Sequence, residues 1–361
     1  MGSKRPERGA FRALGEFVRS AAGSGLFPGA VVAVGRAAGP LYHEAFGRRA
    51  LRPRSEAMTL RTIFDLASLT KVLVTAPLLV EDATRGELSL HDPLERHLSE
   101  TRGTEVGALP LRLLLTHSAG FVPDNPIEDY RGSKRALFRA IAGEPLDSPP
   151  GTRSVYSDVG FVLLQGVLER RSGRSLARLA EERLFRPLGF ADTRFGTRPR
   201  DRGRTAPTER ARGRWLRGTV HDPRARAAAL RGIAGHAGVF GTAIETARYC
   251  ETILRGGIFD GRRILLEETV RAMTTNQCDA AVGVRRGYGF DIESPYSAPR
   301  GALFSRNSFG HTGWTGVSLW IDPDADGYLV LLTNAIHPDG HKDLKAFRAE
   351  AATLAARGLG L

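Results

Sequence analysis

The 361-residue chain is poor in cysteine and lacks the short motifs of metal centres. Its two cysteines, Cys250 and Cys278, are too few for a disulfide framework and do not have metal-site spacing. Neither H-E-x-x-H nor Cys-x-x-Cys occurs, so we expect no zinc site. Residues 322–327 resemble the start of a calcium loop, but Thr333 stands where the twelfth position requires Glu. A hairpin turn is the better interpretation of that segment.

Long apolar runs are also missing. The longest uncharged apolar stretch, residues 72–80, is far too short to span a bilayer, so we expect no membrane span. Residues 1–8 carry charge without an apolar region behind them, and Pro6 occupies the position where myristoylation needs Ser or Thr. These features favour a cytoplasmic protein, or a periplasmic one if a leader has been removed.

Positive charge is abundant, but lysine is scarce. The formal net charge is +13, and only five of the 52 basic residues are lysine. The densest basic segment, residues 194–231, raises the possibility of nucleic-acid binding. No nucleic-acid motif accompanies it, so we expect a solvated, arginine-rich surface loop and no nucleic-acid partner. A mild preference for anionic substrates stays open.

One of the five lysines, Lys71, follows Ser68 by three residues and completes the only S-x-x-K in the chain. Residues i and i+3 lie on one face of a helix, so the hydroxyl and the amine can face each other. A serine needs a partner that takes its proton, and a desolvated lysine can do this. Arginine cannot, because it does not deprotonate in proteins.

A Ser/Lys pair at this spacing is also common on helix surfaces, and the tetrapeptide alone is weak evidence. Two features favour catalysis. Apolar residues flank the pair on both sides, and burial favours the neutral amine. Ser68 also lies near the start of a predicted helix, where free backbone N–H groups stabilise developing negative charge.

The order of elements predicts an α+β fold. Strand patterns occupy residues 28–35, 42–46, 316–321 and 328–333, and helical patterns dominate between them and at residues 8–22 and 342–361. We therefore expect an antiparallel sheet flanked by helices and built from both chain ends, residues 8–66 and 284–361. A mainly helical domain, residues 67–283, is inserted between them, with the active site in the cleft between the two domains.

Two further segments add candidate residues. Tyr156-Ser157-Asp158 precedes a predicted helix, where a phenol can project into a cleft and relay a proton; helix capping is the alternative. His311-Thr312-Gly313 is expected to open the strand that ends at Ile321. A glycine-flanked strand edge lets the backbone approach a ligand closely, although it can also be a simple strand start.

Together the three segments resemble the serine β-lactamase and penicillin-binding-protein family, in the branch of class C β-lactamases, D-alanyl-D-alanine carboxypeptidases and esterases. The resemblance covers residues 25–335 and implies the same two-layer architecture. It implies that Ser68 attacks a carbonyl, that Lys71 or Tyr156 accepts its proton, and that water cleaves the acyl-enzyme without a metal or organic cofactor. The backbone N–H groups of Ser68 and Trp314 would then hold the oxyanion.

The chain departs from the family pattern at two positions. The second motif commonly ends in Asn, and Asp158 when ionised only accepts hydrogen bonds. It can instead pair with Lys71 and keep it protonated, which shifts the proton transfer toward Tyr156. The third motif usually begins with Lys, and His311 is a weaker cation near neutral pH. Both changes weaken the case for efficient β-lactam hydrolysis.

The sequence therefore predicts a serine hydrolase that acts on a small ester, amide or peptidoglycan fragment. Thr312, Gly313 and Asp158 are expected to contact the substrate. His236 and the pair His221-Asp222 either line the pocket or are structural. An acyltransferase, a true β-lactamase and a non-catalytic ligand-binding or anion-binding relative remain alternatives. A G-x-S-x-G hydrolase is disfavoured, because the run that contains Ser118 lacks the first glycine.

Overall fold

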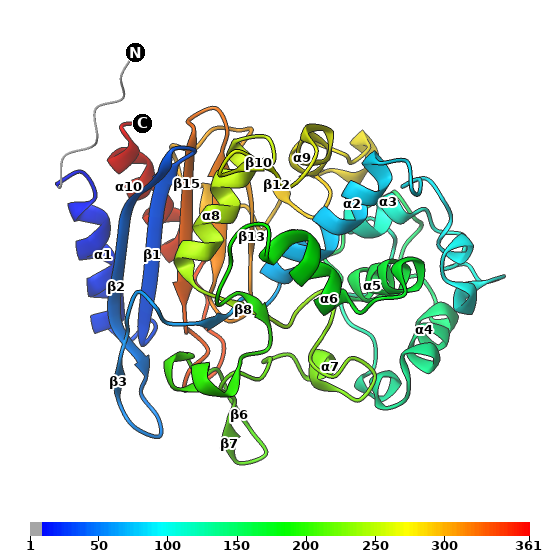
Figure 1. Ribbon diagram of the computed structural model, residues 1–361, viewed down its shortest axis with the longest axis horizontal. Helices are drawn as coiled ribbons and strands as arrows, with labels where there is room; N and C mark the ends of the chain where they lie inside the picture. Colours follow the sequence, from blue (N-terminus) through cyan, green and yellow to red (C-terminus); the bar gives the residue numbers. More distant parts are fainter. Residues whose placement is uncertain (1–8) are drawn as a thin grey trace.

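The computed structural model describes residues 9–361. Residues 1–8, for which the sequence predicts neither a secretory signal nor myristoylation, lie outside the described residues. An antiparallel sheet forms one side of the molecule, and most of the short helices form the other (Figure 1). This arrangement confirms the predicted α+β class.

The sheet has eight strands in the order β11-β12-β13-β14-β15-β1-β2-β3, and neighbouring strands are antiparallel. Its strands come from both ends of the chain: β1 (Gly29–Arg36), β2 (Gly39–Ala50), β3 (Glu56–Ala57), β11 (Arg285–Arg286), β12 (Asp291–Glu293), β13 (Phe309–Thr312), β14 (Ser318–Asp322) and β15 (Gly327–Thr333). The two ends meet where β1 pairs with β15, with Ala30 opposite Thr333.

Helices cover both faces of this sheet. Successive residues of β1 alternate between the faces, so Ala30, Val32 and Val34 pack in one apolar cluster while Val31 and Ala33 pack in the other. The first cluster lies under α1 (Arg12–Gly23) and α10 (Lys345–Leu359), and α8 (Ala243–Leu254) packs on the opposite face. Because both faces of β1 are buried, its sequence is a continuous apolar run instead of an alternating pattern.

Of the remaining helices, α2, α3, α4 and α6 pack against the largely buried helix α5, and α9 packs against α2 (Figure 1). Their bounds are α2 (Ala76–Thr84), α3 (Leu111–Leu115), α4 (Lys134–Gly143), α5 (Val159–Ser172), α6 (Leu176–Ala180), α7 (Pro223–Arg226) and α9 (Glu267–Thr274). Short strands make a three-stranded sheet of β4 (Phe64–Asp65), β8 (Val239–Gly241) and β5 (Arg194–Phe195), and two hairpins, β6 (Arg210–Ala211) with β7 (Arg214–Trp215) and β9 (Ile258–Phe259) with β10 (Arg262–Arg263).

The helix α8 falls within the segment 67–283, yet it packs against β1 and β15 of the sheet. The helices of that segment therefore do not all lie on the far side of the cleft. The division of the chain at residues 66/67 and 283/284 stays a prediction.

One strand assignment from the sequence was wrong. His311-Thr312-Gly313 does not open the strand that ends at Ile321 but ends β13, and a turn separates it from β14. The Gly313 N–H donates to the Val317 carbonyl at 2.8 Å, and Gly316 has a φ of +104°, which favours glycine. This tight turn reverses the chain within the apparent strand pattern. The predicted hairpin turn after Ile321 is confirmed, with Asp322 opposite Gly327.

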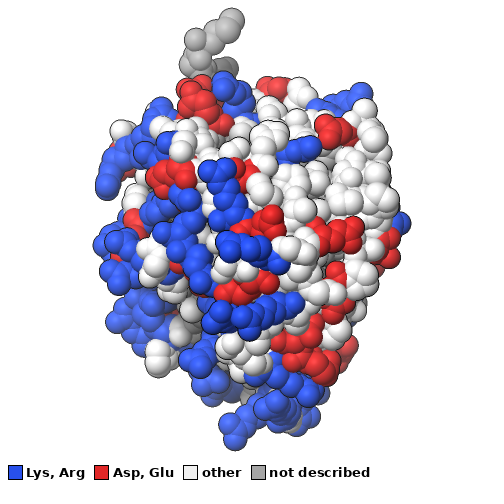
Figure 2. Space-filling view, turned by 90° about the vertical axis from the view of Figure 1, so that its right-hand side faces the viewer, with Lys and Arg blue, Asp and Glu red and all other residues white. Residues whose placement is uncertain are grey.

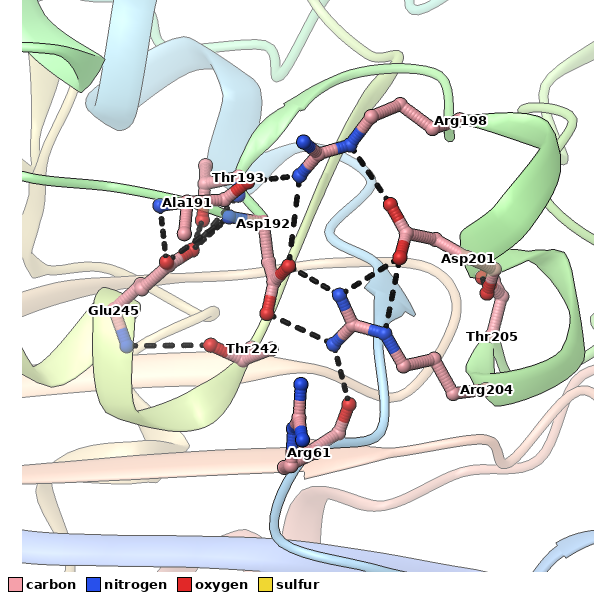
Figure 3. A network of polar contacts seen from close by, with 10 residues as sticks. All are labelled: Arg61, Ala191, Asp192, Thr193, Arg198, Asp201, Arg204, Thr205, Thr242 and Glu245. Carbon is pink, nitrogen blue, oxygen red and sulfur yellow. Dashed lines mark hydrogen bonds and ion pairs between the residues drawn. The ribbon is translucent and has the colours of Figure 1, made fainter.

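Many arginines of the segment 194–231 are held in polar networks. Arg204 is bound by Asp192 and Asp201, and Arg198 contacts the same two carboxylates (Figure 3). On the helical side of the molecule, Lys and Arg side chains are interspersed with Asp and Glu (Figure 2). The charges of Arg198 and Arg204 are therefore locally compensated, and the absence of a nucleic-acid partner stays a prediction.

No helix among residues 9–361 combines the length and the apolar composition needed to cross a membrane.

Candidate active site

Ser68 stands on a sharp turn between β4 and the following helix. Ala67, just before it, has a φ of +47°, a conformation that is uncommon outside glycine and recurs at active sites. The turn is held because the Asp65 carboxylate accepts the Ala67 N–H at 2.9 Å. The Leu66 N–H donates to Val239 of β8 at 2.9 Å. These bonds fix the backbone that presents the Ser68 hydroxyl.

Lys71 lies directly beneath that hydroxyl. It begins a π-helical turn, η1 (Lys71–Thr75), that leads into α2, and its side chain is completely buried. Its Nζ donates to Ser68 Oγ at 3.0 Å and to Asp158 Oδ1 at 2.6 Å. A third, longer contact of 3.4 Å goes to the His236 carbonyl. The serine and the lysine thus face each other as the i, i+3 spacing predicts.

The surroundings of Lys71 keep it charged. Burial favours the neutral amine, but the charge of Asp158 and the contacts with Asp158 and Tyr156 outweigh it, so the pKa of Lys71 is raised. The Tyr156 phenol stays neutral, because burial raises its pKa more than the attraction of Lys71 lowers it. In the resting site we therefore find an ammonium and a neutral phenol beside the serine.

Tyr156 is positioned by a buried histidine. The His117 ring lies against it at a centroid distance of 4.5 Å, and His117 Nδ1 accepts the backbone N–H of Ser157 at 3.1 Å. Burial lowers the pKa of His117 well below its usual range, and Arg286 and Lys71 lower it further. On the other side the Lys71 Nζ lies 4.8 Å from the centre of the phenol ring. The phenol is therefore held between two side chains over the nucleophile.

The turn after β13 closes the site. A Cβ on Gly313 would approach Ala67 Cβ to 3.0 Å and the Leu66 carbonyl oxygen to 3.1 Å, so the two backbones can only meet this closely at glycine. Among the described residues, the backbone N–H groups of Ser68 and Trp314 have no hydrogen-bond acceptor. Arg348 of α10 donates to the carbonyls of Gly313 and Val317 and so braces this turn.

A cleft of about 680 Å³ opens over these groups. The predicted residues that line it are Ser68, Tyr156, Asp158, His311, Thr312, Gly313 and Trp314, while Lys71 lies below its floor. All eight predicted site residues are thus brought together from three separate parts of the chain. Their chemical roles remain proposals.

His311 is not the weak cation that the sequence suggested. It is 4% exposed, and burial together with the charges of Lys71 and Arg286 lowers its pKa well below the usual range. His311 Nδ1 lies 2.7 Å from the Thr312 carbonyl, so Nδ1 carries the proton of the neutral ring. His311 therefore offers the cleft a neutral imidazole.

His236 and the pair His221-Asp222 also line the cleft. His236 Nε2 lies 3.2 Å from Asp222, whose carboxylate caps α7, and His221 Nδ1 lies 3.0 Å from Asp65. Among residues 9–361, Asp158, Asp222 and His236 form a group that could hold a metal ion, because each offers one ligand atom and these atoms lie within 4.8 Å of one another. Asp158 is, however, already bound by the Lys71 ammonium.

Because the Lys71 ammonium already neutralises Asp158, we expect catalysis to be independent of a metal. Incubation with EDTA followed by gel filtration should leave the rate of ester hydrolysis unchanged within about twofold. Loss of activity that returns on adding Zn²⁺ would show instead that Asp158, Asp222 and His236 hold a functional metal.

Several residues of the cleft gave no sequence signal. Arg286, Asp291 and Tyr296 line it from the segment before β13, and Asp124 and Arg348 line it from a loop and from α10. Each stands alone in its segment, without a motif or a periodic pattern that sets it apart. Strand pairing brings Arg286 and Asp291 to the cleft, and the packing of a loop and of α10 brings Asp124 and Arg348 there.

Known proteins are similar to this chain over most of its length. A family model described as beta-lactamase matches residues 12–353. A protein of Escherichia coli O157:H7 named "Putative D-alanyl-D-alanine carboxypeptidase" is 31% identical over 334 residues, which cover 83% of this chain and 76% of that protein. An N-acetylmuramyl-L-alanine amidase of Bacillus subtilis (strain 168) is 29% identical over 351 residues, covering 86% of this chain and 78% of the amidase.

A solved structure shares the fold. EstCE1, a hydrolase with promiscuous acyltransferase activity, superposes with a TM-score of 0.76 at 22% identity, covering 95% of this chain and 98% of that one.

Proposed function

The chain belongs to the β-lactamase family, whose members are serine hydrolases, and we propose that Ser68 is the nucleophile that forms its acyl-enzyme. The observation that carries this proposal is the 3.0 Å contact between Lys71 Nζ and Ser68 Oγ at the floor of the cleft. A serine beside a buried ammonium and a phenol is the arrangement that lowers the cost of an alkoxide.

The charge states of the site support one route for the proton transfer. Lys71 is already protonated, so it acts as a cation that stabilises the developing charge on Ser68. Tyr156 is neutral and lies above the serine, so its oxygen receives the Ser68 proton as its own proton passes to the leaving group. The free N–H groups of Ser68 and Trp314 hold the oxyanion. Water then releases the acyl group and restores Ser68.

We propose a peptidoglycan-related amide or peptide as the substrate class. The similar proteins from Escherichia coli and Bacillus subtilis are named for a peptidoglycan peptidase and an amidase. The cleft, of about 680 Å³, is large enough for a peptide fragment. Its floor pairs Lys71 with Asp158 and holds a neutral His311, so these two positions offer no free cation to the carboxylate of a β-lactam. Further cations line the cleft from the segment that leads into α10 and from α10 itself, namely Lys342, Lys345 and Arg348. We therefore expect slow hydrolysis of nitrocefin.

Rapid mixing with p-nitrophenyl acetate tests the acyl-enzyme. We expect a burst of about one p-nitrophenolate per protein molecule, followed by slower turnover, because acylation releases the phenol before water cleaves the ester. Muropeptides and nitrocefin in the same assay then rank the substrates. A protein that hydrolyses none of the three would contradict the proposal.

Replacing Asp158 with asparagine separates two possible roles of Lys71, a permanently charged ammonium and a neutral general base. Without the carboxylate, burial dominates and the pKa of Lys71 falls below its ordinary value. If the ammonium is the active form, kcat/KM of Asp158→Asn declines as the pH rises through that lowered pKa, while the native protein, in which the pKa of Lys71 is raised, keeps its activity to a higher pH than the variant. A rate that rises with pH in the variant would identify neutral Lys71 as the base.

The pKa of Lys71 can be measured directly in both proteins. The chain has only five lysines, so NMR of protein labelled with ¹³C-lysine gives a small set of resonances to assign. A Lys71 signal that titrates at the same pH in the native protein and in Asp158→Asn would show that Asp158 does not control its charge.

An acyltransferase would use the same acyl-enzyme and differ only in the acceptor that replaces water. Adding alcohols or amines to the burst assay and measuring the acylated acceptor distinguishes the two. A cytoplasmic location stays a prediction.

A further inference from the structure

The end of the cleft beside β13 contains buried polar atoms that the proposed chemistry does not use. Among the described residues, His311 Nε2 and Arg286 Nε are buried and have no hydrogen-bond partner. Both residues line the cleft. An unpaired buried polar group costs stability, so such groups concentrate where a ligand satisfies them.

Arg286 and His311 belong to strands that are two apart in the sheet, with β12 between them. Arg286 on β11 stands opposite Asp291 on β12, and Asp291 stands opposite Gly310 on β13, next to His311. The charge of Arg286 contributes to the lowered pKa of His311, which agrees with this proximity. Both residues also line the same cleft, so a guanidinium and an imidazole face one cavity.

The two groups differ in hydrogen-bonding character. His311 Nδ1 carries the ring proton, which it directs to the Thr312 carbonyl, so Nε2 is an acceptor. Arg286 has only donors, and its remaining contacts, to Asp291 at 3.3 Å and to the Gly289 carbonyl at 3.4 Å, are long. An acceptor beside a donor is complementary to a secondary amide, which has one N–H and one carbonyl.

This part of the site carries no net charge. Arg286 is neutralised by Asp291, both with side chains at most 3% exposed, and His311 is neutral. On this wall a substrate carboxylate would face the lone pair of His311 Nε2, and the guanidinium of Arg286 is already paired with Asp291. A neutral amide suits this wall better than an anion does.

We propose that His311 and Arg286 form a subsite for a secondary amide in the leaving group of the substrate, with the amide N–H donating to His311 Nε2 and its carbonyl accepting from Arg286. The His311 ring lies 5.8 Å from the ring of Tyr156, the group that protonates the leaving group, and this places the subsite on the leaving-group side. This subsite rests on the proposed Ser68 acyl-enzyme. It implies that the leaving group released on acylation contains a peptide bond.

Two matched esters test the subsite. O-acetyl-N-methylglycolamide has one amide N–H in its leaving group, and O-acetyl-N,N-dimethylglycolamide has none, while both keep the carbonyl. We expect the native protein to hydrolyse the first with a kcat/KM about tenfold or more above the second, because only the first pairs with His311 Nε2. Equal rates on the two esters in the native protein would overturn the subsite without any variant.

A substitution then assigns the preference to His311. In His311→Phe the ratio of the two kcat/KM values should fall close to one. His43→Phe is the matched control, because His43 Nε2 is also buried without a partner but lies on β2 outside the cleft. Its ratio should stay at the native value. A His311→Phe protein that keeps the native ratio contradicts the assignment.

Labelling of Ser68 by a fluorophosphonate distinguishes the two possible failures. If Ser68 is labelled and both esters react equally, the subsite is wrong and the acyl-enzyme stands. If Ser68 is not labelled and neither ester reacts, the proposed function fails and the subsite fails with it.

Discussion

Replacing Ser68 with alanine is expected to lower kcat/KM for p-nitrophenyl acetate by a factor on the order of 10⁴ to 10⁶. The hydroxyl is the only group in the site that we assign to attack on the carbonyl, and alanine cannot form the acyl-enzyme. Ser68 is partly exposed in the cleft and its Oγ only accepts from Lys71, so the fold should survive its loss. Burst kinetics and thermal unfolding of the same sample measure both effects.

Ser118 provides the matched control. It lies in the run that weakly resembles another type of serine hydrolase, and it is 1% exposed and hydrogen-bonded to Thr116 at 2.8 Å. Because Ser118 does not line the cleft, Ser118→Ala should lose some stability but keep the burst. A burst that disappears in Ser118→Ala and persists in Ser68→Ala would move the nucleophile to Ser118.

Replacing Lys71 with alanine should slow acylation by a factor on the order of 10² to 10³, the usual cost of removing one preorganised charge from a transition state. The ammonium contacts Ser68 Oγ directly, and its loss also leaves Asp158 facing the nucleophile without a counter-ion. The negative charge that develops on Ser68 is then opposed by a carboxylate instead of being stabilised. The rate constant of the burst phase is the appropriate readout.

Lys134 offers a control of the same type. It makes a 2.6 Å ion pair with Glu169 on α5, and neither residue lines the cleft. Lys134→Ala removes a comparable pair and should leave the burst unchanged. If Lys71→Ala keeps the native burst rate while its unfolding temperature drops, Lys71 is a structural residue and the electrostatic role assigned to it is wrong.

The sequence predicts the core of the site because local spacing determines it. Ser68 and Lys71 are three residues apart, and the helix that follows Ser68 places them on one face, as the 3.0 Å contact shows. The alternating burial of β1 and the helical pattern of α5 likewise arise from neighbours in the chain. Asp158 was expected to bind Lys71 from its charge alone, and the structure brings the two within 2.6 Å.

Features that depend on distant backbone could not be predicted in this way. The turn after Gly313 was not predicted, because the apolar pattern before Ile321 indicates a strand and carries no information on the φ of Gly316. The low pKa of His311 depends on burial and on Lys71 and Arg286, which approach it from other strands and from a helix. The positive φ of Ala67 is imposed by the contacts of Asp65 and Leu66, not by a preference of alanine.

Mass spectrometry of the intact protein after reaction with a fluorophosphonate tests the central claim most directly. The reagent modifies a serine only where the hydroxyl is activated. We expect one adduct per chain, located on Ser68 by peptide mapping, present in Ser118→Ala, slowed in Lys71→Ala and absent in Ser68→Ala. An unmodified native protein, or an adduct that persists in Ser68→Ala, would contradict the assignment of Ser68 as the nucleophile.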